Sequence, residues 1–233
     1  MSGYSGTRAR CMNAYRYAAF TLVELVIVIA IAGTVAVMVG VVMSRPLQGF
    51  ADLSRRAELV DLASGALNRM VRDIRMAVPN SVRVTGAGQL ELLRSPVSGR
   101  YRANLNDGTR SDPPVCSVSP CSIQVLNPLS SQESDRIASM NWMVIYNIGG
   151  TGAGNTIWPL QDNTSSVITP RATFGYAGDD LTLTGAAIAG FGFRYASPQR
   201  RFYLADAVVG YRCANGRIVR KEFSELSDAA AYD

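Results

Sequence analysis

The pattern of apolar positions divides the chain into a helical first part and a strand-rich second part. Residues 20–44 form a nearly continuous apolar run whose single charge is Glu24, and Arg45 is the next charged residue. A run of this length can cross a lipid bilayer as an α-helix, which needs about 20 residues. The pattern therefore predicts a membrane-spanning helix near the start of the chain.

Residues 45–78 follow the pattern of an amphipathic helix. Pro46 predicts an interruption at residues 46–49, where the helix would kink or restart, because proline removes a helix hydrogen bond. Charged side chains occupy the polar faces, where Arg69 and Asp73 are expected to pair at i,i+4. Pro79 predicts that the helix ends at or before Val78. A buried stripe is expected at Leu53, Ala57, Val60, Leu67, Val71, Ile74 and Val78.

From residue 80 the alternation of apolar and polar residues favours β-strands. Residues 81–85 and 89–94 predict one hairpin, and residues 202–213 and 217–223 predict another across Asn215-Gly216. Residues 95–122 are rich in Ser, Pro, Gly and Asn and predict a long exposed loop. Other strands are expected at residues 142–147, 167–174, 180–184 and 191–195. The prediction is an α+β fold, in which the second half of the long N-terminal helix packs on an antiparallel β-rich domain.

Glu24 is the residue of the apolar run that most needs an explanation. An ionisable group within a membrane costs roughly 2.5–3.5 kcal/mol, so it requires a partner. A cut just before Phe20 would create a free amine at nearly the same depth as the carboxylate. The alternative is a plain signal anchor in which Thr21 and Glu24 form a capping box at the first helical turn.

The first 19 residues indicate how such an amine would arise. They contain three arginines and no acid, so their side-chain charge is +3. By the positive-inside rule, this end stays in the cytoplasm and the chain after the helix is exported. The small residues Ala18 and Ala19 precede the apolar run, whereas an ordinary secretory signal is cut after its apolar core. Cleavage after Ala19 would leave the helix on the mature protein.

At these residues the chain resembles the type IV prepilin family, on the match of AA followed by FTLVELVIVIAIAG. The resemblance implies that a membrane prepilin peptidase cuts between Ala19 and Phe20 and N-methylates Phe20. It also implies that Glu24 meets the amine of a neighbouring subunit. The family nearly always has Gly before the cut, where this chain has Ala19. The implied fold is pilin-like, with the second half of the helix lying against a β-rich head.

Three later segments, residues 55–84, 141–149 and 201–213, resemble the MshO-type minor pilins of the mannose-sensitive haemagglutinin (MSHA) pilus. Those are akin to the J-type minor pseudopilin of type II secretion. The implied role is structural: priming or capping a fibre with other minor and major pilins, on an inner-membrane platform with a cytoplasmic ATPase. The implied segments are a leader at 1–19, a transmembrane half-helix at 20–44, an amphipathic half-helix at 45–78 and a periplasmic head at 79–233.

Composition narrows the possible functions. The net charge is +5, of which the leader supplies three, so charge gives little support for a nucleic-acid partner. The chain has no histidine. This excludes Ser-His-Asp and Cys-His catalysis and histidine-containing zinc sites. We therefore expect no enzyme activity, no cofactor and no metal.

The chain has four cysteines. Cys11 lies in the leader, and the other three would face an oxidising periplasm. Cys116 and Cys121 can close a short disulfide loop. Alternatively, Cys213 pairs with one of them and leaves a different odd thiol.

Three alternatives to a pilus assembly subunit are open. Within the same class, the chain would serve type II secretion or DNA uptake. As a pilus-tip adhesin, it would bind sugars through residues 95–135 or through Trp158, Tyr176 and Tyr203. As a membrane-anchored enzyme, it would use an acidic or calcium-binding site at Asp162, Asp179 and Asp180, although such residues are usually turn formers.

Overall fold

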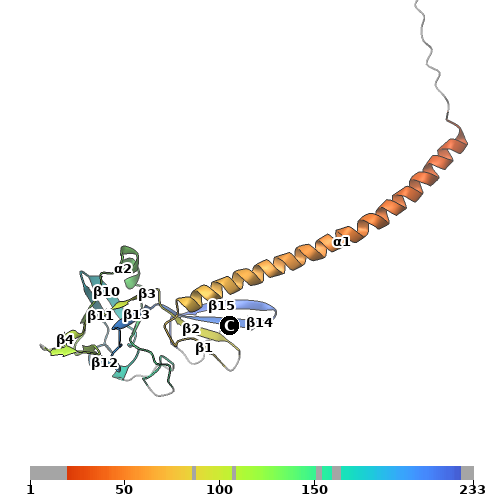
Figure 1. Cartoon of the computed structure of the whole chain (residues 1–233). Coiled ribbons are helices and arrows are strands. Elements are labelled where there is room, and N and C mark those ends of the chain that lie inside the picture. The colour runs from red at the N-terminus through yellow and green to blue at the C-terminus, as the bar shows by residue number, and fades with distance from the viewer. Residues whose placement is uncertain (1–19, 86–87, 107–108, 151–153, 159–163, 227–233) are drawn as a thin grey trace, which may run out of the picture. The chain divides into compact units, whose positions relative to one another are not determined.

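The computed structural model describes residues 20–85, 88–106, 109–150, 154–158 and 164–226. The chain divides into two compact units, Met1–Leu62 and Ala63–Asp233. Helix α1, Leu22–Arg75, runs through the boundary between them, and the second unit contains all the strands (Figure 1). The fold is α+β, as the sequence predicts.

Helix α1 is continuous for 54 residues and contains Pro46 in its interior. The predicted interruption at residues 46–49 is therefore wrong. Nucleating a new helix is unfavourable, whereas extending an existing one past a single missing hydrogen bond costs less. The helix ends at Arg75, and Pro79 follows within one turn.

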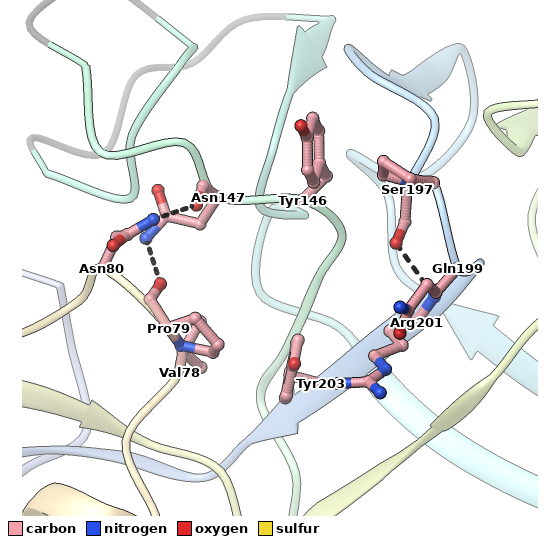
Figure 2. A pocket seen from close by; sticks show the side chains of 10 residues that line it. Val78, Pro79, Asn80, Tyr146, Asn147, Ser197, Gln199, Arg201 and Tyr203 are labelled. Carbon is pink, nitrogen blue, oxygen red and sulfur yellow. Dashed lines mark hydrogen bonds between the residues drawn. The ribbon is translucent and has the colours of Figure 1, made fainter.

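The chain leaving α1 is fixed to the head by two reciprocal amide contacts (Figure 2). Asn80 Nδ2 donates to the main-chain oxygen of Asn147 over 2.9 Å, and Asn147 Nδ2 donates to the oxygen of Pro79 over 2.8 Å. Val78 is buried and its N–H donates to the oxygen of Leu93. The exit from the helix is thus held by side chains and by main-chain bonding.

The sheet nearest in sequence to the helix has four antiparallel strands in the order β1-β2-β14-β15. Asn215 and Gly216 both have positive φ, as a tight hairpin between β14 and β15 requires. The two predicted hairpins are confirmed. The strands are β1 Arg83–Val84, β2 Leu90–Arg94, β14 Ala207–Ala214 and β15 Arg217–Phe223.

The remaining strands form small sheets around the larger part of the core. One has the order β3-β13-β8, from Val97–Arg100, Arg201–Ala205 and Trp142–Val144. A second has the order β10-β11-β7, from Thr173–Ala177, Asp180–Thr184 and Cys121–Gln124. A third has the order β6-β12-β9, from Val115–Cys116, Phe191–Phe193 and Ser165–Ser166, with β12 and β9 parallel. Strands β4 and β5, Asn104–Asn106 and Thr109–Ser111, form a two-stranded pair.

Three predictions for the head need correction. Residues 95–122 are not one exposed loop, because they contain strands and bury Val97, Tyr101 and both nearby cysteines. The predicted strand 202–213 is two strands from different sheets, divided at Asp206. Residues 167–172 lie outside the strands, and β10 begins only at Thr173, after Pro170.

A short helix, α2 Ser131–Ile137, was not predicted. It has a complete capping box: Ser130 Oγ accepts from the N–H of Glu133, and the Glu133 carboxylate accepts from the N–H of Ser130. This S-x-x-E signal is readable in the sequence.

The face of α1 that packs on the four-stranded sheet differs from the predicted stripe. Met70 and Ala77 pack against a cluster of Leu92, Val209 and Tyr211, while Leu67, Val71 and Ile74 remain exposed. Asp73, which was assigned to a polar face, is only 5 % exposed. Its partners are on the sheet, so the predicted pair with Arg69 is also wrong.

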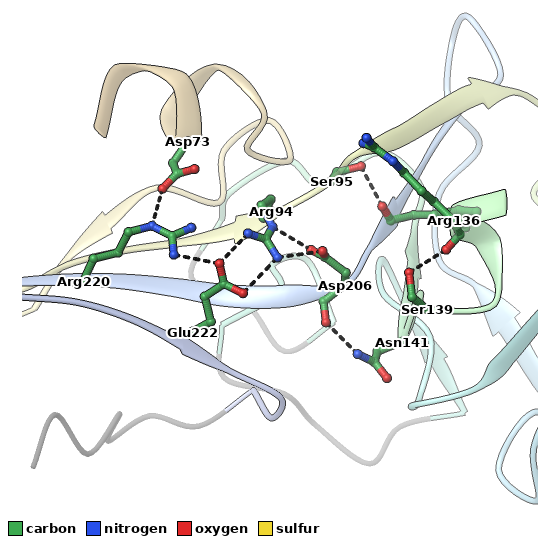
Figure 3. Close-up of polar contacts among 10 residues, drawn as sticks. Asp73, Arg94, Ser95, Arg136, Ser139, Asn141, Asp206, Arg220 and Glu222 are labelled. Atoms are coloured by element: carbon green, nitrogen blue, oxygen red, sulfur yellow. Dashed lines mark hydrogen bonds and ion pairs between the residues drawn. The ribbon is translucent and has the colours of Figure 1, made fainter. Parts of the chain in front are cut away.

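Asp73 begins a chain of charged contacts that crosses the sheet (Figure 3). Its carboxylate accepts a hydrogen bond from Tyr211 and one from Arg220 Nε over 2.7 Å. Arg220 also pairs with Glu222 over 2.7 Å, and Glu222 pairs with Arg94 over 2.6 Å.

Asp206 completes this charged chain. Arg94 donates to both of its carboxylate oxygens, over 3.0 and 2.7 Å. Such bidentate pairs are the stronger kind of ionic contact. Asp206 therefore joins strand β2 to the break between β13 and β14.

The pKa values of Asp73 and Glu222 are lowered. Burial acts to raise the pKa of Asp73, but the hydrogen bonds from Arg220 and Tyr211 and the charges of Arg220 and Arg94 outweigh it. The hydrogen bond from Arg94 is the main cause of the lowered pKa of Glu222. Acids with a depressed pKa stabilise the folded state above their ordinary pKa values, here 3.8 for Asp73 and 4.5 for Glu222. That contribution is lost as the pH falls through the lowered values.

We predict that Asp73→Ala destabilises the head by about 3 kcal/mol, because it removes the acceptor of the Tyr211 hydroxyl and of Arg220 Nε, and leaves Arg220 with Glu222 alone. Thermal unfolding of the detergent-solubilised chain measures this change. The native chain should lose stability on acidification below about pH 4, and the variant should show a shallower loss. Asp61→Ala, on the exposed part of the same helix, is the control and should change little. Equal stability of the two variants would contradict the role of Asp73.

Candidate functional site

The N-terminus of α1 carries the residues that the sequence singles out. Phe20 is exposed, and Thr21 caps the helix because its Oγ1 accepts from the N–H of Glu24 over 3.3 Å. Ala19 and the rest of the leader, with Cys11, lie outside the described residues.

The Glu24 carboxylate makes no hydrogen bond or ion pair within the part of the chain that the structure describes. The capping box considered for Thr21 and Glu24 is thus only half formed there, in contrast to the complete box at α2. Capping therefore accounts for Thr21 but gives the Glu24 side chain no partner.

The helix around Glu24 is long and apolar enough to span a membrane. Its most apolar window of 18 residues has a mean hydropathy of 2.9, and the rest of the protein buries none of it. Apart from Glu24, no charged residue occurs between Leu22 and Ser44. A lone carboxylate thus lies close to the start of a large exposed apolar surface.

The cysteines of the head lie in two different places. Cys116 and Cys121 form a disulfide with a Cα–Cα distance of 5.3 Å, and both are buried. The bond joins the start of β7 to the end of β6. Cys213 is a free, exposed cysteine on β14, opposite Ile218.

The head also contains a hollow of about 300 Å³ where three segments meet (Figure 2). It is lined by Pro79 and Asn80 after α1, by Tyr146 after β8, and by Gln199, Arg201 and Tyr203 at the start of β13. A second hollow of about 320 Å³ shares Arg201 and Tyr203 and adds Ser98 and Arg100 from β3. The two hollows share Arg201 and Tyr203, and we call them together the arginine groove.

The three aromatic candidates for sugar binding do not form one platform. Trp158 donates from Nε1 to the oxygen of Ser81 over 2.8 Å, and the guanidinium of Arg83 lies 4.0 Å from its ring centroid. Tyr176 packs against a different core cluster from Trp158 and accepts from the N–H of Leu129. Tyr203 alone of the three lines the arginine groove.

The acidic candidates do not form a metal site among the described residues. Asp180 accepts from the hydroxyl of Ser122 over 3.2 Å and begins β11, directly after the turn at Gly178 and Asp179. Asp162 lies outside the described residues. No group of three or more His, Cys, Asp or Glu side chains arranged to hold a metal occurs in the described part of the chain.

Sequence reasoning missed the arginine groove because its parts are far apart in the chain. Arg100 and Arg201 become neighbours only through the antiparallel register of β3 and β13. Nothing in the local pattern around either residue reveals that pairing.

Comparison with known proteins identifies the N-terminal segment. Residues 15–40 match the family described as "Prokaryotic N-terminal methylation motif". No curated protein and no solved structure matches the chain. The matched region includes the predicted cut, Phe20, Glu24 and most of the apolar run.

The motif supports a type IV pilin-like or pseudopilin-like protein, and the α+β fold is consistent with one. The motif implies processing by a prepilin peptidase and assembly with other pilins. Proteins of this kind are typically structural, and their apolar N-terminal helix suits a membrane-anchored precursor.

We predict that Cys116→Ser destabilises the head by about 2 kcal/mol under oxidising conditions, the entropic value for a short closed loop. Cys213→Ser is the matched control and should change stability by less than about 0.5 kcal/mol. Thermal unfolding of both variants measures the difference, and peptide mapping without reduction identifies the bond. A linked pair that includes Cys213 would contradict the prediction.

Proposed function

We propose that this chain is a minor pilin that primes or caps assembly of an MSHA-like type IV pilus. The observation that carries the proposal is the methylation motif at residues 15–40, which overlaps an apolar run at residues 20–44 whose only acid, Glu24, has no partner in the described chain. The sequence resemblance of residues 55–84, 141–149 and 201–213 favours the MshO-type subunit. The alternative within the class is a minor pseudopilin of type II secretion.

In this proposal a leader of residues 1–19 is removed by prepilin peptidase between Ala19 and Phe20, and Phe20 is N-methylated. Residues 20–44 hold the precursor in the inner membrane, residues 45–78 continue the helix, and residues 79–233 form the periplasmic head. An assembly platform with a cytoplasmic ATPase then extracts the subunit into the fibre.

Glu24 gives assembly its register in this scheme. In the lone subunit its carboxylate lies in an apolar helix, at a cost of roughly 2.5–3.5 kcal/mol if it enters the membrane unpaired. Docking places it against the Phe20 amine of a neighbouring subunit, which relieves that cost. Buried charges are best attested in this use, as devices that fix register.

We predict that Glu24→Ala leaves membrane insertion and leader cleavage unchanged but lowers incorporation into the fibre by about tenfold or more. Immunoblots of sheared fibres and of membranes measure the two pools separately. Glu58→Ala removes an acid from the polar half of the same helix and should incorporate normally. Normal incorporation of Glu24→Ala would contradict the pairing.

Ala19→Arg should block removal of the leader, because a large cation replaces a small residue at the cut. The product would then keep its first 19 residues and an unmethylated Phe20. Intact mass of the membrane-extracted protein detects both changes. Ala19→Gly is the control and should be cleaved at least as well as the native chain. A native chain that retains Met1 in cells with the peptidase would contradict the proposal itself.

A further inference from the structure

The arginine groove contains two like charges that the fold places opposite each other. Arg100 on β3 and Arg201 on β13 are direct cross-strand partners, and both line the groove. Like charges in such positions destabilise a sheet. The pair therefore lowers the stability of the folded head.

No acid among the described residues pairs with either guanidinium group. Arg100 donates from Nε to the main-chain oxygen of Gln199 over 3.0 Å. The Arg201 side chain makes no hydrogen bond or ion pair with any residue that the structure describes. Among the described residues, no aspartate or glutamate lines either hollow. The nearby acid Asp112 pairs with Arg200 instead.

Backbone strain is concentrated at the same place. Four non-glycine residues in the described chain have positive φ, and three of them, Asn80, Tyr146 and Arg200, line the groove or adjoin it. Such conformations are unfavourable, most of all for a bulky residue such as tyrosine, and they tend to occur at binding sites. Tyr146 keeps 42 % of its surface exposed at the mouth of the groove.

We propose that the arginine groove binds an acidic polysaccharide through its uronic-acid units. Arg100 and Arg201 would bind the carboxylates, since guanidinium groups match carboxylate geometry. Tyr146 and Tyr203 offer ring surfaces to a sugar ring, and Asn80, Gln199 and Ser98 offer neutral hydrogen-bonding groups for hydroxyls. This assignment concerns the head alone and holds for any fibre that the chain joins.

Other anionic polymers fit the groove less well. Nucleic acid binding grows with the number of phosphates neutralised, and two arginines are few for that purpose. Arginine clusters also bind acidic peptides. A polyglutamate chain, however, has no hydroxyl groups for the neutral side chains of Asn80, Gln199 and Ser98 to bind.

The test measures binding of polygalacturonate to the full chain in detergent, with neutral dextran, a polyglutamate peptide and single-stranded DNA as comparison probes. Polygalacturonate should bind most tightly and lose affinity with added salt. Arg201→Gln and Arg100→Gln should each weaken binding by about tenfold or more, the scale of one charged hydrogen bond. Arg217→Gln makes the same charge change on exposed β15 and should bind normally.

The melting temperatures of the variants show whether a loss of binding comes from the lost side chain or from unfolding of the head. Because Arg100→Gln and Arg201→Gln each remove a like-charge contact, both variants should melt at the native temperature or above it. Tyr146→Ser should also weaken binding, through loss of the ring.

Absence of polygalacturonate binding, or binding unaffected by the arginine variants, would overturn the proposal. Equal or tighter, arginine-dependent binding of DNA or polyglutamate would overturn the polysaccharide assignment. Normal piliation of these variants would leave the assembly role intact in every case.

Discussion

A carboxylate in apolar or buried surroundings needs a positive partner, and helix α1 has two acids to which this constraint applies. Asp73 meets it inside the molecule, where Arg220 and Tyr211 hydrogen-bond its carboxylate on the sheet. Glu24 does not meet it within the described chain, and it lies in the most apolar part of the same helix. One acid thus fixes the helix end to the head, and the other has no partner among the described residues.

The surroundings of the two acids differ, and so do the contacts that the two ends of helix α1 can make. Near Asp73 the burial cost is offset by a continuous chain of contacts through Arg220, Glu222 and Arg94 to Asp206. Breaking such a chain leaves charges without partners, so this part favours one arrangement of helix and sheet. Near Glu24 no such network occurs in the described chain, and the surrounding surface is apolar. That surface requires lipid or other apolar helices around it.

The sequence predicts features that depend on local spacing and misses those that depend on register. Residues 18–24 reveal the methylation motif because its small residues, threonine and acid lie within seven consecutive positions. Asn215-Gly216 reveals a hairpin because its two residues are adjacent. The break at Asp206 is invisible locally, since apolar residues alternate on both sides of it. At the break, Asp206 pairs with Arg94, which lies more than a hundred residues earlier in the sequence.

The packed face of helix α1 is another feature that local sequence patterns do not predict. By periodicity alone, the apolar stripe through Leu67, Val71 and Ile74 is the face expected to pack on the sheet. The structure instead turns Met70, Asp73 and Ala77 inward, because Tyr211 and Arg220 on the sheet provide partners for a carboxylate. Periodicity along the helix cannot reveal that contact, since the partners lie in the last two strands of the chain.

Likewise, nothing in the sequence around Arg100 or Arg201 marks either residue until strand pairing brings them together. A head that keeps this unfavourable pair, beside three strained residues, has features that folding alone does not require. Binding at that place explains both features with one cause.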